Sequence, residues 1–96
     1  MNFRFHPDAE LELNHAIDYY EACQEHLGLE FAQEVYATIQ RIVDFPNAWQ
    51  QMTSQARRCL TNRFPFSIVY QDIHNEIIII AIMHQNQKPF YWKKRA

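Results

Sequence analysis

The sequence predicts an α+β fold: an N-terminal strand, an antiparallel hairpin of two α-helices, then three antiparallel strands that complete one twisted sheet. Two observations lead to this expectation. Apolar residues recur about every 3.6 positions as far as Pro46, and about every second position after residue 55. The segment Ile77–Met83 is apolar throughout, as in a strand buried on both faces. A chain of 96 residues, 48% of them hydrophobic, is expected to form a single domain, 1–96, with its own core.

The first half of the chain predicts a short strand and two helices. Phe3–Phe5 alternates like an edge strand, and Pro7 suits the first position of a helix, where its missing N–H costs nothing. The first helix is expected over about 7–27, and the only glycine, Gly28, is expected to end it. The second helix is expected over about 29–44, before Pro46. The first helix has apolar residues at helical spacing, all expected to face the core: Ala9, Leu13, Ala16, Ile17, Tyr20, Cys23 and Leu27.

The second half predicts three strands after a loop at Asn47–Gln55. These are Arg57–Arg63, Phe64–Asp72 and Glu76–Met83, and a turn at Ile73–Asn75 joins the last two. Because Ile77–Met83 is apolar on both faces, the last strand should be central in the sheet. Helices should cover it on at least one side.

Charge is divided unevenly between the two halves. Residues 1–50 carry nine acidic residues against Arg4 and Arg41, whereas residues 51–96 carry seven basic residues against Asp72 and Glu76. Solvated helix faces explain part of the acidic excess, but the clustering of basic residues also favours two surfaces with different partners. The sequence shows no apolar run of membrane-spanning length and no export signal, so we expect a cytoplasmic protein with reduced thiols at Cys23 and Cys59.

Several kinds of chemistry find no support in the residue spacing. The five histidines lack HxxxH spacing and the cysteines lack CxxC spacing, so no metal site is expected. There is no glycine-rich loop to cradle a phosphate, and no cofactor is expected. Arg63, His84, Lys88 and Tyr91 remain, and these residue types could supply the base, acid and cations that metal-free RNA cleavage requires. The alternative is that the aromatic residues only cover the sheet and that His84 bonds a backbone carbonyl.

Three stretches together resemble the RelE/ParE superfamily of bacterial toxins. They are FHPDAELELNHAIDYYEACQEHLGLEFAQEV, RRCLTNRFPFSIVY and IIIIAIMHQNQKPFYWKKR, which occur in the family's order and cover nearly the whole chain. The RFPFSIVY strand, and Ala81 followed by His84, Pro89, Tyr91 and Trp92, are most similar to the ParE-like branch. That branch poisons DNA gyrase, whereas the RelE-like branch cuts messenger RNA on the ribosome. Gln87 departs from the pattern, since the family usually places an arginine between this histidine and the proline.

The resemblance implies a toxin of a type II toxin–antitoxin system that inhibits DNA gyrase and is neutralised by a ParD-like antitoxin in a hetero-oligomer. The alternatives are a metal-independent endoribonuclease using Arg63, His84 and Tyr91, or an attenuated homologue that only binds antitoxin. Expected antitoxin contacts are Glu21, Glu25 and Glu34 on the acidic helical half. No membrane partner is expected. The expected target-binding residues combine positive charge with aromatic rings: Arg63, His84, Lys88, Tyr91, Trp92, Lys93, Lys94 and Arg95.

Overall fold

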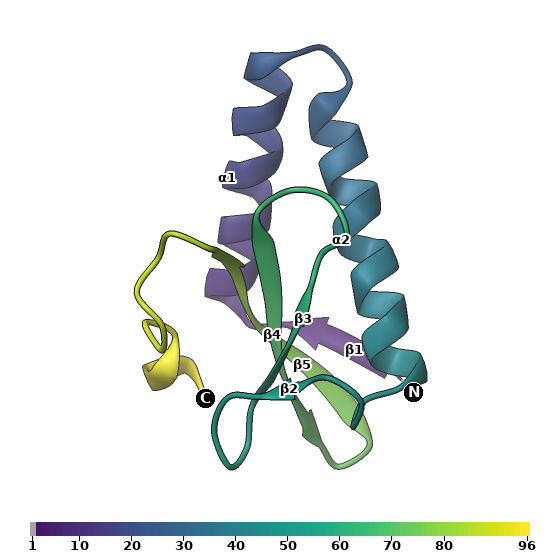
Figure 1. The fold of residues 1–96 in the computed structure, drawn as a ribbon, viewed down its shortest axis with the longest axis vertical. Helices are drawn as coiled ribbons and strands as arrows, with labels where there is room; N and C mark the ends of the chain where they lie inside the picture. The colour runs from purple at the N-terminus through teal and green to yellow at the C-terminus, as the bar shows by residue number, and fades with distance from the viewer. Residues whose placement is uncertain (1) are drawn as a thin grey trace.

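The computed structural model describes residues 2–96 and confirms the α+β prediction (Figure 1). A short strand leads into two long helices that lie side by side, and the remaining strands complete the sheet beneath them. None of the described helices is both long and apolar enough to cross a membrane. The elements in chain order are β1 (Asn2–Phe5), α1 (Pro7–Cys23), α2 (Leu27–Asp44), β2 (Gln50–Gln51), β3 (Arg57–Leu60), β4 (Phe66–Ile73), β5 (Glu76–His84) and the 3-10 helix η1 (Lys93–Arg95).

The first helix begins where the sequence predicts, but it ends earlier. Pro7 is its first residue, and the Nδ1 of His6 accepts a hydrogen bond of 3.0 Å from the N–H of Asp8, which satisfies one free donor of the first turn. The helix stops at Cys23 rather than near Leu27. Cys23 is exposed, so its predicted place in the core is wrong: it lies at the last position of α1 and does not reach the buried layer.

Gly28 does not end the first helix; it lies in the first turn of α2. A Cβ atom at this position would come within 2.6 Å of the carbonyl oxygen of Ile17, so only glycine allows the two helices to approach this closely. The carboxylate of Glu21 accepts hydrogen bonds from the N–H groups of His26, at 3.0 Å, and Gly28, at 3.1 Å. Glu21 therefore satisfies free donors at the start of α2.

The sheet has five strands in the order β1-β5-β4-β3-β2, with β1 parallel to β5 and the other pairs antiparallel. As predicted, β1 is an edge strand, and β5 has neighbours on both sides and is buried from Ile77 to Met83. The two-residue strand β2 falls in a predicted loop. The boundaries around Arg63 differ from the prediction, because β3 ends at Leu60 and β4 begins at Phe66. The hydroxyl of Thr61 closes the intervening loop by donating to the carbonyl of Phe64 at 2.8 Å.

The sheet is buried on both faces. The helices cover one face, where the core includes Phe31, Ile68 and Ile79, and the opposite face is covered by Ala56 and Trp92. β5 contains a bulge: Val69 pairs with Ala81 and Tyr70 with Ile79, so Ile80 is an additional residue without a partner in β4. The segment after β5 folds back toward the sheet and brings Trp92 into the second core (Figure 1).

Candidate functional site

Arg63 and His84 lie at the same end of the sheet, as the antiparallel pairing predicts. His84 is the last residue of β5 and pairs with Phe66, the first residue of β4, whereas Arg63 lies in the loop just before that strand. The guanidinium of Arg63 is 3.0 Å from a carboxylate oxygen of Glu30 and 5.0 Å from the centroid of the Phe64 ring. Arg63 is thus held toward α2, although its side chain remains largely exposed.

Gln87 has a structural role in the turn after β5. Its side-chain oxygen accepts a hydrogen bond of 2.8 Å from the backbone N–H of His84, and the Nδ1 of His84 accepts one of 3.0 Å from the N–H of Asn86. The imidazole also lies edge-on to Phe66, with ring centroids 5.1 Å apart. A neutral side chain that fixes the turn therefore stands where the family resemblance places an arginine.

A cavity of about 580 Å³ lies between α1 and this end of the sheet. Part of its wall comes from α1, and sequence analysis did not include these helical residues in the site. Their signal was present in the chain, because Glu12, His15, Ala16 and Tyr19 are three or four positions apart and so share a helix face. The cavity residues are Glu12, His15, Ala16, Tyr19, Tyr20, Pro65, Phe66, Ile82, His84 and Gln87.

Glu12 joins the first helix to the end of the chain. Its carboxylate accepts a hydrogen bond of 2.6 Å from the hydroxyl of Tyr91, and bonds of 2.9 and 3.1 Å from the guanidinium of Arg95. It also accepts the backbone N–H of Ile82 at 3.0 Å, and Arg95 donates to the carbonyl of Ile80 at 3.2 Å. Because β1 pairs with β5 only as far as Ile79, these side chains satisfy the part of β5 that β1 does not reach.

Tyr91 is held in a state that does not suit proton transfer. Burial, and then the hydrogen bond to the Glu12 carboxylate, raise the pKa of Tyr91 well above its ordinary value. The phenol therefore stays protonated at neutral pH, with its proton directed at Glu12. A general acid or base works best with a pKa near the operating pH. This geometry disfavours the catalytic role that the nuclease alternative gives to Tyr91.

The C-terminal segment divides into buried and exposed residues. Trp92 is fully buried, and Tyr91 and Arg95 are half-buried in their contacts with Glu12. These three side chains hold the segment on the sheet, so Trp92 is not available to a target in this conformation. The exposed residues of the predicted target-binding set in this segment are Lys88, Lys93 and Lys94. The Nε1 of Trp92 is buried without a hydrogen-bond partner within residues 2–96.

The acidic residues predicted to contact an antitoxin differ in their availability. Besides the capping role of Glu21, the carboxylate of Glu34 accepts the N–H groups of Asn62 at 2.6 Å and Arg63 at 3.3 Å. Glu25 is exposed, and its only ion pair in the described chain is with His26 at 3.6 Å. Two of the three predicted residues are thus used within the protein.

The fold and this site define a small toxin of the RelE/ParE type, and comparison with known proteins agrees. The chain belongs to the family described as the ParE toxin of the type II toxin-antitoxin system parDE, whose family model matches residues 3–89. The predicted superfamily and its ParE-like branch are therefore confirmed. A comparison with curated proteins found no match.

Solved structures include one of the same fold, from the chromosomal ParDE toxin–antitoxin system of P. aeruginosa. It superposes with a TM-score of 0.76 at 20% sequence identity, and the alignment covers 88% of this chain and 95% of that chain. At this level of identity the similarity concerns the fold. The shared architecture extends over nearly the full length of the other chain.

Proposed function

We propose that this ParE-like toxin acts by binding DNA gyrase and not by cutting RNA. The observation that carries the choice is the hydrogen bond of 2.6 Å from Tyr91 to Glu12, which removes a phenol from proton transfer. Gln87 supports the same choice, because it supplies no positive charge for a phosphorane where the family resemblance places an arginine. Loss of such a charge from a phosphoryl-transfer site costs roughly 10²-fold or more in rate. The proposal places the protein in the cytoplasm, where gyrase acts.

The proposed target surface consists of the exposed Lys88, Lys93 and Lys94 together with Arg63 and the cavity beside His84. Basic side chains on this surface would steer encounter with an acidic protein or a DNA-bound enzyme. Tyr91, Trp92 and Arg95 would contribute by holding the segment in place. Phe90, which is 40% exposed, adds an apolar contact beside Lys93, whose Nζ lies 5.9 Å from the centroid of the Phe90 ring.

We propose a ParD-like antitoxin as the cognate partner, bound on the helical hairpin. The hairpin exposes four large apolar side chains that a partner could cover: Leu11, Tyr19, Leu29 and Tyr36. Glu25 and the other acidic side chains of the hairpin would complement basic residues of the partner. An amphipathic helix with basic flanks fits this surface, and binding would give a toxin–antitoxin hetero-oligomer.

A supercoiling assay with purified gyrase and relaxed plasmid tests the proposal. The wild-type protein should inhibit supercoiling, and Lys93→Gln/Lys94→Gln should raise the concentration for half-inhibition several-fold. The matched control is Arg4→Gln/Arg58→Gln, which removes the same charge from the sheet without touching the proposed surface and should behave as wild type. Equal loss in both double variants would mean that only net charge matters.

The two alternatives give different outcomes. Ribosome-dependent messenger RNA cleavage that disappears with His84→Ala would establish the endoribonuclease and overturn the gyrase proposal. Tight binding of a ParD-like protein without inhibition of either gyrase or translation would identify the attenuated, antitoxin-binding homologue.

A further inference from the structure

A cavity of about 440 Å³ lies beside β3 at the edge of the sheet, and it shares no residue with the proposed target surface. The edge is open here because β2 is only two residues long. β2 pairs with Arg57 and Arg58 and leaves Leu60, the last residue of β3, without a neighbouring strand on this side. The volume of the cavity is typical of sites for small molecules.

Two arginines of the cavity wall meet at this edge. Arg41 reaches it from α2, and its Nη2 donates to the carbonyl of Leu60 at 3.0 Å. Arg58 extends along β2, and its Nε donates to the side-chain oxygen of Gln50 at 2.8 Å. Both residues are half-buried, and neither forms an ion pair within residues 2–96. Two positive charges thus lie in one wall without a carboxylate partner.

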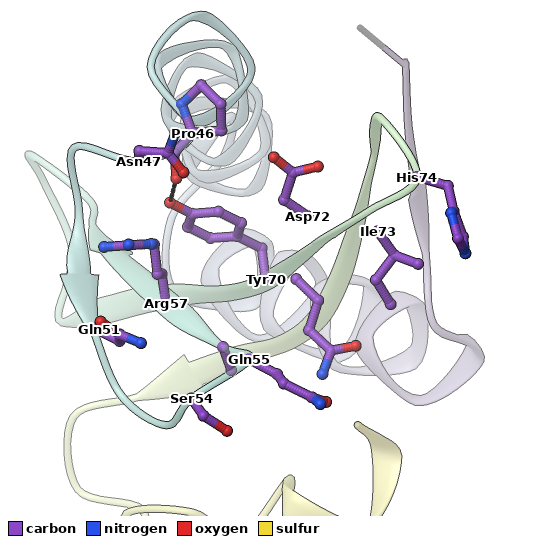
Figure 2. A pocket seen from close by; sticks show the side chains of 12 residues that line it. Pro46, Asn47, Gln51, Ser54, Gln55, Arg57, Tyr70, Asp72, Ile73 and His74 are labelled. Carbon is purple, nitrogen blue, oxygen red and sulfur yellow. Dashed lines mark hydrogen bonds between the residues drawn. The ribbon is translucent and has the colours of Figure 1, made fainter.

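The uncompensated charge distinguishes this cavity from other parts of the described chain. Arg4, Arg63 and Arg95 each pair with a carboxylate. Arg57 has no ion pair either, but it lines a different cavity, of about 590 Å³, whose wall also holds Asp72 (Figure 2). The described wall at the edge of β3 contains no acidic residue, so its positive charge is not offset there.

The rest of the wall is uncharged and partly apolar. Leu60 is 61% exposed, and the half-buried Trp49 needs no polar ligand, because its Nε1 donates to the carbonyl of Arg41 at 3.4 Å. The Glu34 carboxylate lies near Asn62 but outside the wall, where it accepts the N–H of that residue at 2.6 Å. Apolar surface beside two cations suits a ligand that has both an apolar body and a negative charge.

We propose that this cavity binds a carboxylate with an apolar body, either a small organic acid or the C-terminal residue of a peptide. Within residues 2–96 each of the two guanidinium groups uses a single nitrogen, Nη2 in Arg41 and Nε in Arg58. The remaining nitrogens donate to the oxygens of the carboxylate, a pairing that guanidinium groups favour. The apolar body lies against Leu60 and Trp49. The proposal is independent of the toxin's target.

Phenylacetate is a direct probe, titrated into ¹⁵N-labelled wild-type protein and followed by two-dimensional NMR. The indole N–H signal of Trp49 should shift and saturate at roughly millimolar concentration, whereas that of Trp92, in the second core, should not shift. Phenylacetamide, which lacks the charge, and acetate, which lacks the apolar body, should each bind more weakly by roughly tenfold or more. N-acetylphenylalanine represents a peptide end, and only a site for a peptide should prefer it to phenylacetate.

Variants assign the parts of the ligand to residues. Arg58→Gln should weaken phenylacetate binding roughly tenfold and leave phenylacetamide binding unchanged, because only the charged probe uses the guanidinium. Leu60→Ser should weaken phenylacetate and leave acetate unchanged. Arg41→Gln should weaken phenylacetate as Arg58→Gln does. Because Arg41 also bonds the backbone of Leu60, Arg58→Gln carries the test on its own.

Arg4→Gln is the matched control, because it removes the same charge from β1, at the opposite edge of the sheet. This variant should bind phenylacetate as wild type does. The proposal fails if the Trp49 signal of wild type does not shift with phenylacetate, or if Arg4→Gln weakens binding as much as Arg58→Gln. It also fails if phenylacetamide binds as tightly as phenylacetate, or if phenyl phosphate binds more tightly.

Discussion

The carboxylate of Glu12 accepts a hydrogen bond of 2.6 Å from the hydroxyl of Tyr91, which lies 79 residues further along the chain. The same carboxylate accepts a hydrogen bond from the guanidinium of Arg95. A single acidic residue of α1 thereby positions the segment that we propose to contact the target.

Glu12→Gln should loosen the C-terminal segment. The change leaves Arg95, whose side chain is 17% exposed, with only the more distant Asp8 at 3.6 Å as a carboxylate partner. The substitution leaves the partly buried guanidinium of Arg95 without its nearest negative charge, so the cost of removing this guanidinium from water is no longer offset. We therefore expect a loss of about 2–4 kcal/mol in the free energy of unfolding. Urea unfolding measures it, with the exposed Glu10→Gln as control. A loss no larger than that of the control would mean that the contacts of Glu12 with Tyr91 and Arg95 do not stabilise the fold.

Trp92 should contribute to the stability of the fold through the packing of its ring and not through a hydrogen bond of its N–H. Trp92→Ala should cost about 3–5 kcal/mol, as expected for a large aromatic residue removed from a core. Trp92→Phe should cost much less, because it also removes the buried Nε1 that lacks a partner. Thermal or urea unfolding of both variants gives the two values. Equal costs would show that the indole N–H has a partner in solution.

Gly28→Ala should destabilise the helical hairpin. The added Cβ would lie 2.6 Å from the backbone oxygen of Ile17, which cannot rotate away, so the helices must separate. We expect a loss of about 1–3 kcal/mol, the range for overpacked sites. Gln33→Ala, at an exposed position of α2, is the control for helix propensity and should change stability little. A stabilising Gly28→Ala would contradict the contact.

Tyr70 should make stability depend on alkaline pH. Burial is the main cause that raises the pKa of Tyr70 from 10.0 to about 12, so the fold favours the neutral phenol. This contribution to stability is fully present below pH 10 and is lost as the pH rises from 10 to 12. The stability advantage of wild type over Tyr70→Phe should therefore shrink across this window. Urea unfolding from about pH 9 upwards measures the difference; an advantage that stays constant would exclude a raised pKa. Tyr36→Phe, at an exposed position, is the control.

Gln87→Arg should not create a ribonuclease. The variant restores a positive charge near His84, but Tyr91 remains bonded to Glu12 and its pKa remains raised. Ribosomes programmed with a defined messenger RNA should therefore yield no site-specific cleavage product, as with wild type. Cleavage by Gln87→Arg alone would show that the missing charge, and not the position of Tyr91, is what disfavours catalysis.

The sequence predicted most of the fold because its periodicities are strong and its boundary residues are distinctive. Pro7 begins α1 as expected, and the apolar run from Ile77 forms an interior strand buried on both faces, with β1 on one side and β4 on the other. Where every position is apolar, however, alternation carries no information, so the bulge at Ile80 could not be foreseen. Gly28 was misplaced because a glycine required for close helix contact looks, in sequence, the same as one that ends a helix.

The candidate site was harder to predict, because contacts over long separations determine which side chains are free. Trp92 and Lys93 are neighbours in the chain, yet one is fully buried and the other exposed. The role of Glu12 depends on partners 70 to 83 residues away, which no local pattern indicates. The acidic residues Glu21 and Glu34 appeared to be surface charges, but they satisfy backbone N–H groups of other segments.

The parallel pairing of β1 with β5 has a consequence for how the protein is made. Phe3 lies opposite Ile77, so β1 has no partner in the sheet until a segment about 70 residues further along the chain has been synthesised. At a synthesis rate of roughly 5–20 residues per second, the N-terminal strand and α1 wait several seconds for the strand that buries them. The hydrogen bonds between Glu12 and Arg95 form later still, since Arg95 follows β5 in the chain. The N-terminal strand and α1 thus stay incompletely packed in each nascent chain until β5 and Arg95 have been synthesised.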